Sequence, residues 1–405
     1  METISLLRNT KMTLNLEKLS KFDLEKDLQS RLFKDEVLKE EFGDFYDTIR
    51  EIHIANRFIR DCPSFPRSTE EIIRFELSSA IGATLAIEGT ILREEEIKES
   101  FRKADLQKKL EDKEQEAQNS RKAYKYIINL VDDCAGKFTY KEKHIKEIHK
   151  YLTENIEYIS PNVPGQYRDT KAMFGEPRKI SFCKSKSDIE TIMTKFTNWL
   201  NEKSSGLLCG INIVKAIMAH YYLTEIHPFG DGNGRTARAL EALVLYVNKI
   251  SPYCFWSLAN FWSANRDTYL NHLGNIRITC DPWEFLKWGT TGYLREFKRA
   301  KDSVLRKLKQ LMLQDYVRWL AYKKKINPRI YGVLMLIIHS GRKPLNEFLS
   351  SPELMTLYSN RKISTRYKDF NKMEKSLNLI RILKEGGKKF IEPNFQELEE
   401  LEYAI

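Results

Sequence analysis

The segment HPFGDGNGRTAR, residues 227–238, gathers side chains that are suited to phosphate chemistry. Its glycine-rich centre, residues 232–234, predicts a tight turn that enters a helix. Such a turn points several backbone N–H groups outward and forms an anion-binding nest at the positive end of the helix. Arg235 and Arg238 are three residues apart, so they share one helical face and can clamp phosphate oxygens.

Two further residues of the segment could supply a base and a metal ligand. His227 stands before the turn, and an imidazole can accept a proton near neutral pH. Asp231 directly precedes the nest, and a carboxylate beside phosphates is a natural Mg²⁺ ligand. Phe229 is expected to anchor the loop in the core. A cradle, a clamp, a metal ligand and a base together indicate phosphate-ester chemistry on a nucleotide.

Helices are expected to position this segment. Apolar residues recur at helix spacing over residues 211–221 before it and over residues 240–247 after it. His220 falls within the first of these stretches and is expected to be a core or capping histidine. Upstream, prolines and a glycine interrupt the helical pattern, and residues 166–183 alternate weakly around Gly175 and Pro177. We interpret that stretch as a β-hairpin or loop.

These residues carry a resemblance to a known family. The segment is similar at every position to the signature of the Fic family, HPFx[DE]GNGRxxR. The resemblance extends to IKEIHKYLTENI and VPGQYRD upstream and to FWSANRDTYLNHL downstream, and it covers about residues 70–297. Where the family often shows Tyr-Tyr, this chain has Tyr269-Leu270.

The resemblance implies a transferase that moves AMP from ATP to a Ser, Thr or Tyr hydroxyl of a target protein or of the enzyme itself. His227 would be the base, and Asp231 would hold Mg²⁺ against the phosphates. Arg238 would bind the γ-phosphate. The nucleotide-binding set implied in this way is Gly232, Asn233, Gly234, Arg235, Arg238 and Tyr269. A flap over roughly residues 166–182 would pair with the backbone of the target by strand addition.

A second motif, TLAIEG at residues 84–89, fits the inhibitory pattern of the family, [ST]xxxE[GN]. By itself it also fits an ordinary helix end that is capped by Gly89. Beside an intact Fic motif it implies inhibition. Glu88 would pair with Arg238 in the place of the γ-phosphate, so that ATP would bind only in a pose unsuited to in-line attack. Thr84 would help to hold that helix.

Several alternatives stay open. The same residues would serve the reverse reaction, in which Glu88 orients water for the removal of AMP. Transfer of the γ-phosphate by a Doc-like kinase is disfavoured, because Gly234 is retained where Doc has lysine. Other donors, such as UTP or CDP-choline, are not excluded. A fourth alternative is a DNA-binding regulator that uses the Fic core as a nucleotide sensor.

The positive charge of the chain is concentrated near its C-terminal end. The formal net charge is +11, and residues 295–343 alone hold fourteen Lys or Arg against three acids. Such a cluster favours a polyanionic partner, although a solvated helix face gives the same pattern. We expect an apolar helix over 327–340, a basic amphipathic helix over 364–378 with Ser364 or Thr365 as N-cap, and a hairpin around Gly386-Gly387.

This order gives a winged-helix outline, which could contact DNA, a protein or a second copy of the chain. We therefore expect a mainly α protein, with a Fic-type helical bundle core, a short β-hairpin flap and a C-terminal winged-helix-like domain. The expected parts are an N-terminal helical region (1–69), the catalytic domain (70–297, with the inhibitory helix around 78–89), a basic helical connector (298–325) and the winged-helix-like domain (326–405).

Composition excludes other classes of protein. Six scattered cysteines without a CxxC pair argue against a disulfide scaffold and a zinc site, and favour buried thiols. The longest apolar run, Tyr331 to Ile338, is too short to span a bilayer. The N-terminus has no sustained apolar stretch of the kind that a signal peptide needs. We expect a cytoplasmic protein that makes no contact with membranes.

Overall fold

The computed structural model describes residues 37–62, 66–134, 136–157, 162–174, 179–180, 185–202, 210–250, 258–279 and 282–396. The chain divides into two compact units, Met1–Lys301 and Asp302–Ile405. The division falls inside α13, a helix of 40 residues from Trp283 to Tyr322. This helix includes most of the expected connector.

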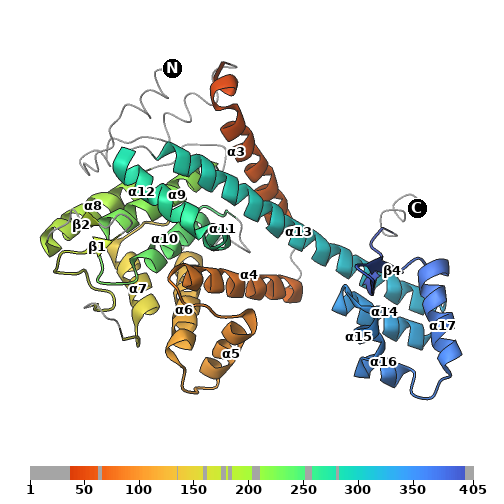
Figure 1. Ribbon diagram of the computed structural model, residues 1–405. Helices are drawn as coiled ribbons and strands as arrows, with labels where there is room; N and C mark the ends of the chain where they lie inside the picture. The colour runs from red at the N-terminus through yellow and green to blue at the C-terminus, as the bar shows by residue number, and fades with distance from the viewer. Residues whose placement is uncertain are drawn as a thin grey trace. The chain divides into compact units, whose positions relative to one another are not determined.

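The first unit consists almost entirely of helices, as expected for a mainly α protein (Figure 1). In chain order they are α3 (Val37–Asp61), α4 (Pro66–Ile87), α5 (Glu94–Asp105), α6 (Asp112–Asp132), α7 (Glu142–Thr153), α8 (Lys186–Asn201), α9 (Gly210–Ile226), α10 (Asn233–Val247), α11 (Leu258–Ala264), α12 (Arg266–Thr279) and the start of α13. The strands β1 (Met173–Phe174) and β2 (Lys179–Ile180) pair antiparallel, with Met173 opposite Ile180. They form the predicted short hairpin.

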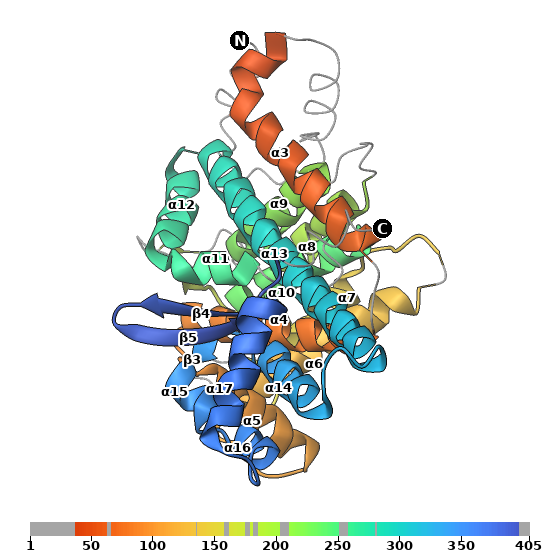
Figure 2. The same cartoon turned by 90° about the vertical axis from the view of Figure 1, so that its right-hand side faces the viewer.

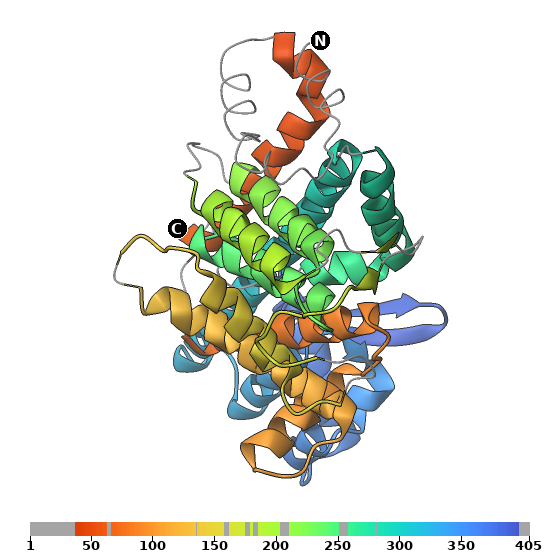
Figure 3. The ribbon, with the colours of Figure 1, turned by 90° about the vertical axis from the view of Figure 1, so that its left-hand side faces the viewer.

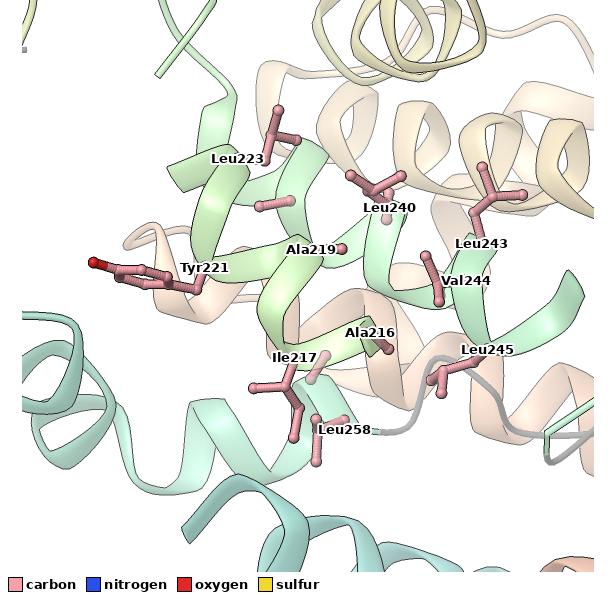
Figure 4. Packing of buried hydrophobic residues seen from close by; sticks show 14 of the residues in the cluster. Ala216, Ile217, Ala219, Tyr221, Leu223, Leu240, Leu243, Val244, Leu245 and Leu258 are labelled. Atoms are coloured by element: carbon pink, nitrogen blue, oxygen red, sulfur yellow. The ribbon is translucent and has the colours of Figure 1, made fainter. Parts of the chain in front are cut away.

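Helices α9 and α10 form the centre of this unit. Every described side chain of α9 from Ile213 to its end is buried, as expected for a helix that is surrounded by others. Figure 4 shows its packing against α10, with Ala219 and Leu223 of α9 and Leu240 of α10. Helices α4, α6 and α7 also contact α10 (Figure 3). The loop that joins α9 to α10 is therefore held by a rigid frame.

A buried ion-pair cluster joins α4 to the first half of α13. Arg299 donates from Nη1 and Nη2 to the two carboxylate oxygens of Glu76, at 2.9 and 2.5 Å. It also donates from Nε to Glu296, at 2.9 Å. Glu76 has no exposed surface. Its charge is compensated by the bidentate arginine, which is the geometry that a buried carboxylate requires.

The second unit contains helices and a three-stranded sheet. After the end of α13 come α14 (Pro328–Ser340), β3 (Lys343–Pro344), α15 (Leu345–Leu349), α16 (Pro352–Leu357), α17 (Ile363–Asn371), a π-helical turn (Lys372–Ser376), β4 (Ile380–Glu385) and β5 (Lys388–Pro393). The sheet is antiparallel with the order β3-β5-β4. Figure 2 shows the β4–β5 hairpin extending away from the helices of this unit.

This unit has its own core, built on α14 and closed by α17. The core includes Val333 and Ile337 of α14 and Ile391 of β5, all fully buried. Arg329 of α14 donates from Nε to Asp369 of α17 at 2.6 Å. Asn327 is the N-cap of α14, and its side chain accepts the N–H of Ile330.

The predicted N-cap of the next long helix is wrong. Lys362 occupies that position with extended backbone angles, and Ser364 and Thr365 already lie inside the first turn of α17. No side-chain hydrogen bond caps this end of the helix. The N-cap position of α17 therefore holds a lysine, whose side chain cannot accept a hydrogen bond, where a serine or threonine acceptor was expected.

The prediction of buried thiols is wrong for the two cysteines that the structure describes. Cys62 and Cys134 are half-buried, because each follows the last residues of a helix near the surface. The other four cysteines lie outside the described residues. Over the ranges given above, no helix is long and apolar enough to cross a membrane.

Candidate active site

The turn between α9 and α10 is fixed by Asn233 and Phe229. The N–H of Phe229 donates to Oδ1 of Asn233, and Nδ2 of Asn233 donates to the carbonyl of Phe229, both at 3.0 Å. Phe229 is fully buried, as predicted for the anchor of the loop. Gly232 is the N-cap of α10 with φ of +74°, a left-handed conformation that favours glycine. These contacts fix the position of the turn and of the first residues of α10.

His149 of α7 contacts this turn through its ring. Its ring stacks on Phe229 with the centroids 3.7 Å apart. The N–H of Gly165 donates to Nδ1 at 2.9 Å, so the ring proton sits on Nε2, which donates to the carbonyl of Asp231 at 3.0 Å. Burial lowers the pKa of His149 to about 4, although its hydrogen bond to Asp231 favours the charged form. The ring is therefore neutral at pH 7.

His149 was not among the predicted site residues. The available signal was its position among Ile145, Ile148 and Leu152, which places a histidine on the apolar stripe of α7. All four of these residues are buried.

His227 directly follows α9 in a left-handed conformation, with φ of +49°. Its Nδ1 lies 3.2 Å from the carbonyl of Thr224, which can only accept, so Nδ1 carries the proton and Nε2 carries the lone pair. Arg168 donates from Nε to the carbonyl of His227 at 2.7 Å, which holds the backbone in place. The ring of Phe174, from β1, stacks on the imidazole with the centroids 4.0 Å apart. The hairpin therefore lies against the candidate base.

Arg238 is buried on α10 and is held by residues at the end of α4. Its Nη2 lies 2.5 Å from Oε1 of Glu88, and its Nε donates to Oγ1 of Thr84 at 2.5 Å. Nη2 also donates to the carbonyl of Thr84 at 3.2 Å. The structure thus brings together three residues that the two sequence motifs place about 150 positions apart.

Glu88 also covers the glycine turn. A Cβ atom built on Gly234 would lie 2.6 Å from Oε1 of Glu88 and 3.3 Å from Nη1 of Arg238. Burial would raise the pKa of Glu88, but the charge of Arg238 and the hydrogen bond from it outweigh burial and hold the pKa below its ordinary value. An ionised carboxylate therefore lies at the amino end of α10, where an anion is favoured.

Arg235 and Asp231 form the other side of the site. Arg235 donates from Nη1 to Glu116 of α6 at 3.1 Å and from Nη2 to Asp231 at 3.4 Å. Asp231 also accepts the N–H of Gly232 on its side chain. Its side chain is 45% exposed. Asp231 is therefore accessible to a ligand, whereas the guanidinium of Arg235 is anchored in the protein.

Tyr269 of α12 lies in a buried hydrogen-bonded network. Its hydroxyl is 2.8 Å from Nε2 of His220, and Nδ1 of His220 is 2.5 Å from Glu241. The hydroxyl of Tyr293 donates to the same carboxylate at 2.9 Å. Burial raises the pKa of Tyr269, with a contribution from Arg238 that lowers it, so its phenol stays protonated. The expectation that His220 is a core histidine is confirmed, because it has no exposed surface.

The chain is similar to known proteins over the part that holds this site. Residues 139–245 match the model of the Fic/DOC family. A segment of 123 residues is 33% identical to a protein adenylyltransferase Fic of Culex quinquefasciatus, covering 30% of this chain and 22% of that protein. A segment of 129 residues is 34% identical to a protein adenylyltransferase Fic of Drosophila grimshawi, covering 29% of this chain and 25% of that protein. The match thus spans about a quarter of the length of these curated relatives.

A solved structure shares the fold. It is a Fic domain containing signaling protein from Bacteroides thetaiotaomicron, with a TM-score of 0.50 and 18% sequence identity. The likeness covers 64% of this chain and 96% of that chain.

Proposed function

Since residues 139–245 of this chain match the Fic/DOC family, we propose that it is a protein adenylyltransferase whose own Glu88 inhibits it. The enzyme would transfer AMP from ATP to a hydroxyl side chain of a target protein or of itself. The observation that carries this proposal is the arrangement around a single turn. One segment supplies an imidazole, a glycine turn at a helix start and a buried arginine, and the carboxylate of Glu88 lies on both the turn and the arginine.

The chemistry would be one in-line displacement. The hydroxyl oxygen attacks the α-phosphorus, the bond from phosphorus to the bridging oxygen of pyrophosphate breaks, and the hydroxyl proton passes to Nε2 of His227. The nucleotide phosphates would lie on the amino end of α10, where backbone N–H groups point outward. His149 and Phe229 would hold that end of the helix in place.

The donor set around Asp231 fits Mg²⁺ that arrives with ATP. Within the described ranges, no three His, Cys, Asp or Glu side chains gather into a group that could hold a metal ion. Mg²⁺ is usually bound through one or two carboxylates together with substrate phosphates, so one accessible aspartate suffices. Bound there, the ion would neutralise charge on the phosphate oxygens.

The contacts of Arg238 support self-inhibition. The outer phosphate of ATP and the Glu88 carboxylate are both anions that would bind the same guanidinium above Gly234. With Glu88 in place, the triphosphate would have to bind in another pose. The hydroxyl could then no longer attack in line with the leaving group.

The target would dock on the β1–β2 hairpin. An extended segment of the target can pair with a short strand through backbone hydrogen bonds, which require little sequence specificity. Phe174 of this hairpin stacks on His227. A hydroxyl that is presented from a paired strand would therefore arrive beside the base.

Glu88 also supports a second candidate function, the removal of AMP from a modified protein. Its carboxylate is ionised and 38% exposed, so it could orient a water molecule for attack on the phosphorus. Release of AMP from a pre-modified target by the wild type, but not by Glu88→Gly, would favour this direction.

The experiment that tests the proposal uses ATP labelled at the α-phosphate or at the γ-phosphate. We expect α-label on protein with Glu88→Gly, little with the wild type, and none with the double variant Glu88→Gly/His227→Ala. Label from the γ-position would indicate phosphoryl transfer and would overturn the proposal. The absence of label from every variant, although each still binds ATP, would also overturn it.

A further inference from the structure

Most of the net positive charge of the chain lies in the second unit. Residues 302–405 carry twenty Lys or Arg against twelve Asp or Glu, so they supply +8 of the net charge of +11 of the whole chain. The main acids near α17 and the hairpin are already paired. Asp369 binds Arg329, and Glu385 lies 2.6 Å from Arg342. The lysines around them therefore present uncompensated charge.

The β4–β5 hairpin places like charges face to face. In its register, Lys384 is directly opposite Lys389, and Lys388 follows the Gly386-Gly387 turn. Like charges in directly opposed positions destabilise a pair of strands. All three lysines are exposed, and the one acid opposite them, Glu385 across from Lys388, has its carboxylate 2.6 Å from Arg342. The destabilisation that these opposed lysines cause is readily explained if the tip of the hairpin binds an anionic partner.

Helix α17 presents a second basic surface from the same unit. Lys362 and Lys368 are exposed, and neither has an acidic partner in the described part of the chain. The exposed side of the helix also carries Ser364, Tyr367 and Asn371. These side chains can form hydrogen bonds with base edges, whereas the lysines can reach phosphates.

We propose that the second unit binds double-stranded DNA. Helix α17 would enter the major groove, and the three lysines of the hairpin, Lys384, Lys388 and Lys389, would contact the phosphate backbone. The major groove of B-DNA accepts one α-helix, and a helix together with a projecting two-stranded ribbon is a shape that can bridge a groove and its flanking phosphates. Figure 2 shows the hairpin projecting from its unit. This proposal does not depend on the proposed transferase activity.

The composition of the surface favours duplex DNA over other partners. Protein–protein interfaces are depleted in lysine at their centre. Channels for single-stranded nucleic acid use several aromatic side chains on which successive bases stack. In the described part of α17 and the hairpin, Tyr367 is the one strongly exposed aromatic residue. Proteins that recognise duplex DNA typically present a helix with polar side chains together with lysines or arginines around it.

The test measures binding of the full-length protein to a fluorescent duplex of about two helical turns, ~20 base pairs, by anisotropy over a salt titration. The hairpin variant is Lys384→Gln/Lys388→Gln/Lys389→Gln. Its matched control, Lys323→Gln/Lys324→Gln/Lys325→Gln, removes the same charge just beyond the end of α13. Each lost phosphate contact should reduce the slope of log K against log salt by about one, so the hairpin variant should lose about three. The control should keep the wild-type slope.

Three results would overturn the proposal. The first is no duplex binding at low salt. The second is an equal loss in the hairpin variant and the control, which would indicate non-specific attraction. The third is tighter binding to single-stranded RNA of the same length than to the duplex. His227→Ala should bind DNA like the wild type, so failure of this proposal and failure of AMP transfer can be told apart.

Discussion

Substitution of Glu88 should activate the proposed AMP transfer in proportion to the interaction that each variant removes. In the wild type the Glu88 carboxylate binds Arg238 at 2.5 Å. Glu88→Gln keeps a hydrogen-bond acceptor of the same shape but removes the charge. Glu88→Ala removes the contact altogether. We therefore expect the rate of AMP transfer to rise from the wild type to Gln and again to Ala.

The magnitude follows from the geometry of the pair. Arg238 is 3% exposed and Glu88 is 38% exposed, so water screens one side of the contact. We therefore take the lower part of the range for a charge-assisted hydrogen bond, about 2 kcal/mol for the whole contact and about 1 kcal/mol for its ionic part. The fraction of enzyme with Arg238 available to ATP should then rise about 30-fold for Ala and about 5-fold for Gln.

The assay is the initial rate of α-label incorporation at ATP concentrations well below saturation. A matched control is available on the same helix. Glu70 pairs with Arg74 at 2.6 Å, but both side chains are more than half exposed. Glu70→Gln should therefore change neither the rate nor ATP binding.

The reasoning would be refuted in one of two ways. If Gln and Ala activate equally, then crowding above Gly234 matters and charge does not. If Glu70→Gln also activates, then the rate responds to the stability of α4 and not to the contact with Arg238.

Two further predictions concern the frame of the site. The unfolded chain binds a proton at His149 near pH 6.5, whereas the native pKa is about 4. Stability should therefore fall as the pH is lowered, by about 2 kcal/mol between pH 6.5 and about 5; denaturant titrations should show a shallower dependence for His149→Gln. Arg299→Met would leave the buried carboxylate of Glu76 without its cation and should cost about 3 kcal/mol. The exposed control Arg74→Met should change the same denaturation midpoint very little, and an equal shift in both variants would contradict the argument.

The parts of the site that are local in sequence could be predicted from it. Residues 227–238 form one continuous turn and helix start, so residue types and spacing were enough to locate the turn and the start of α10. They did not predict that Arg235 and Arg238 would bind different partners on the two sides of the site. The helical class followed from apolar periodicity. The same local logic located the β4–β5 hairpin from its Gly-Gly turn.

The supporting residues could not be predicted, because they come from distant segments and have ordinary types. Glu116 binds Arg235 from 119 positions away, and Arg168 binds the backbone of His227 from 59 positions away. Glu116 lies on a helix with many charged residues, so nothing in the sequence distinguishes it as the partner of Arg235. The prediction of the N-cap of α17 failed for another reason. The packing of Phe370 and Met373 into the core fixes where the helix lies, and this outweighs the preference for serine or threonine at its start.

The attachment of α4 at two points has a consequence for kinetics. Glu76 joins it to Arg299, and Thr84 joins it to Arg238 eight residues later, about 12 Å along the helix. A helix that is attached twice in this way cannot swing out without breaking a buried ion pair. Glu88 can leave Arg238 by rotation of its own side chain, which takes nanoseconds and not milliseconds. Inhibition would then be a rapid equilibrium that is settled before each turnover, and progress curves should start at full slope, without a lag.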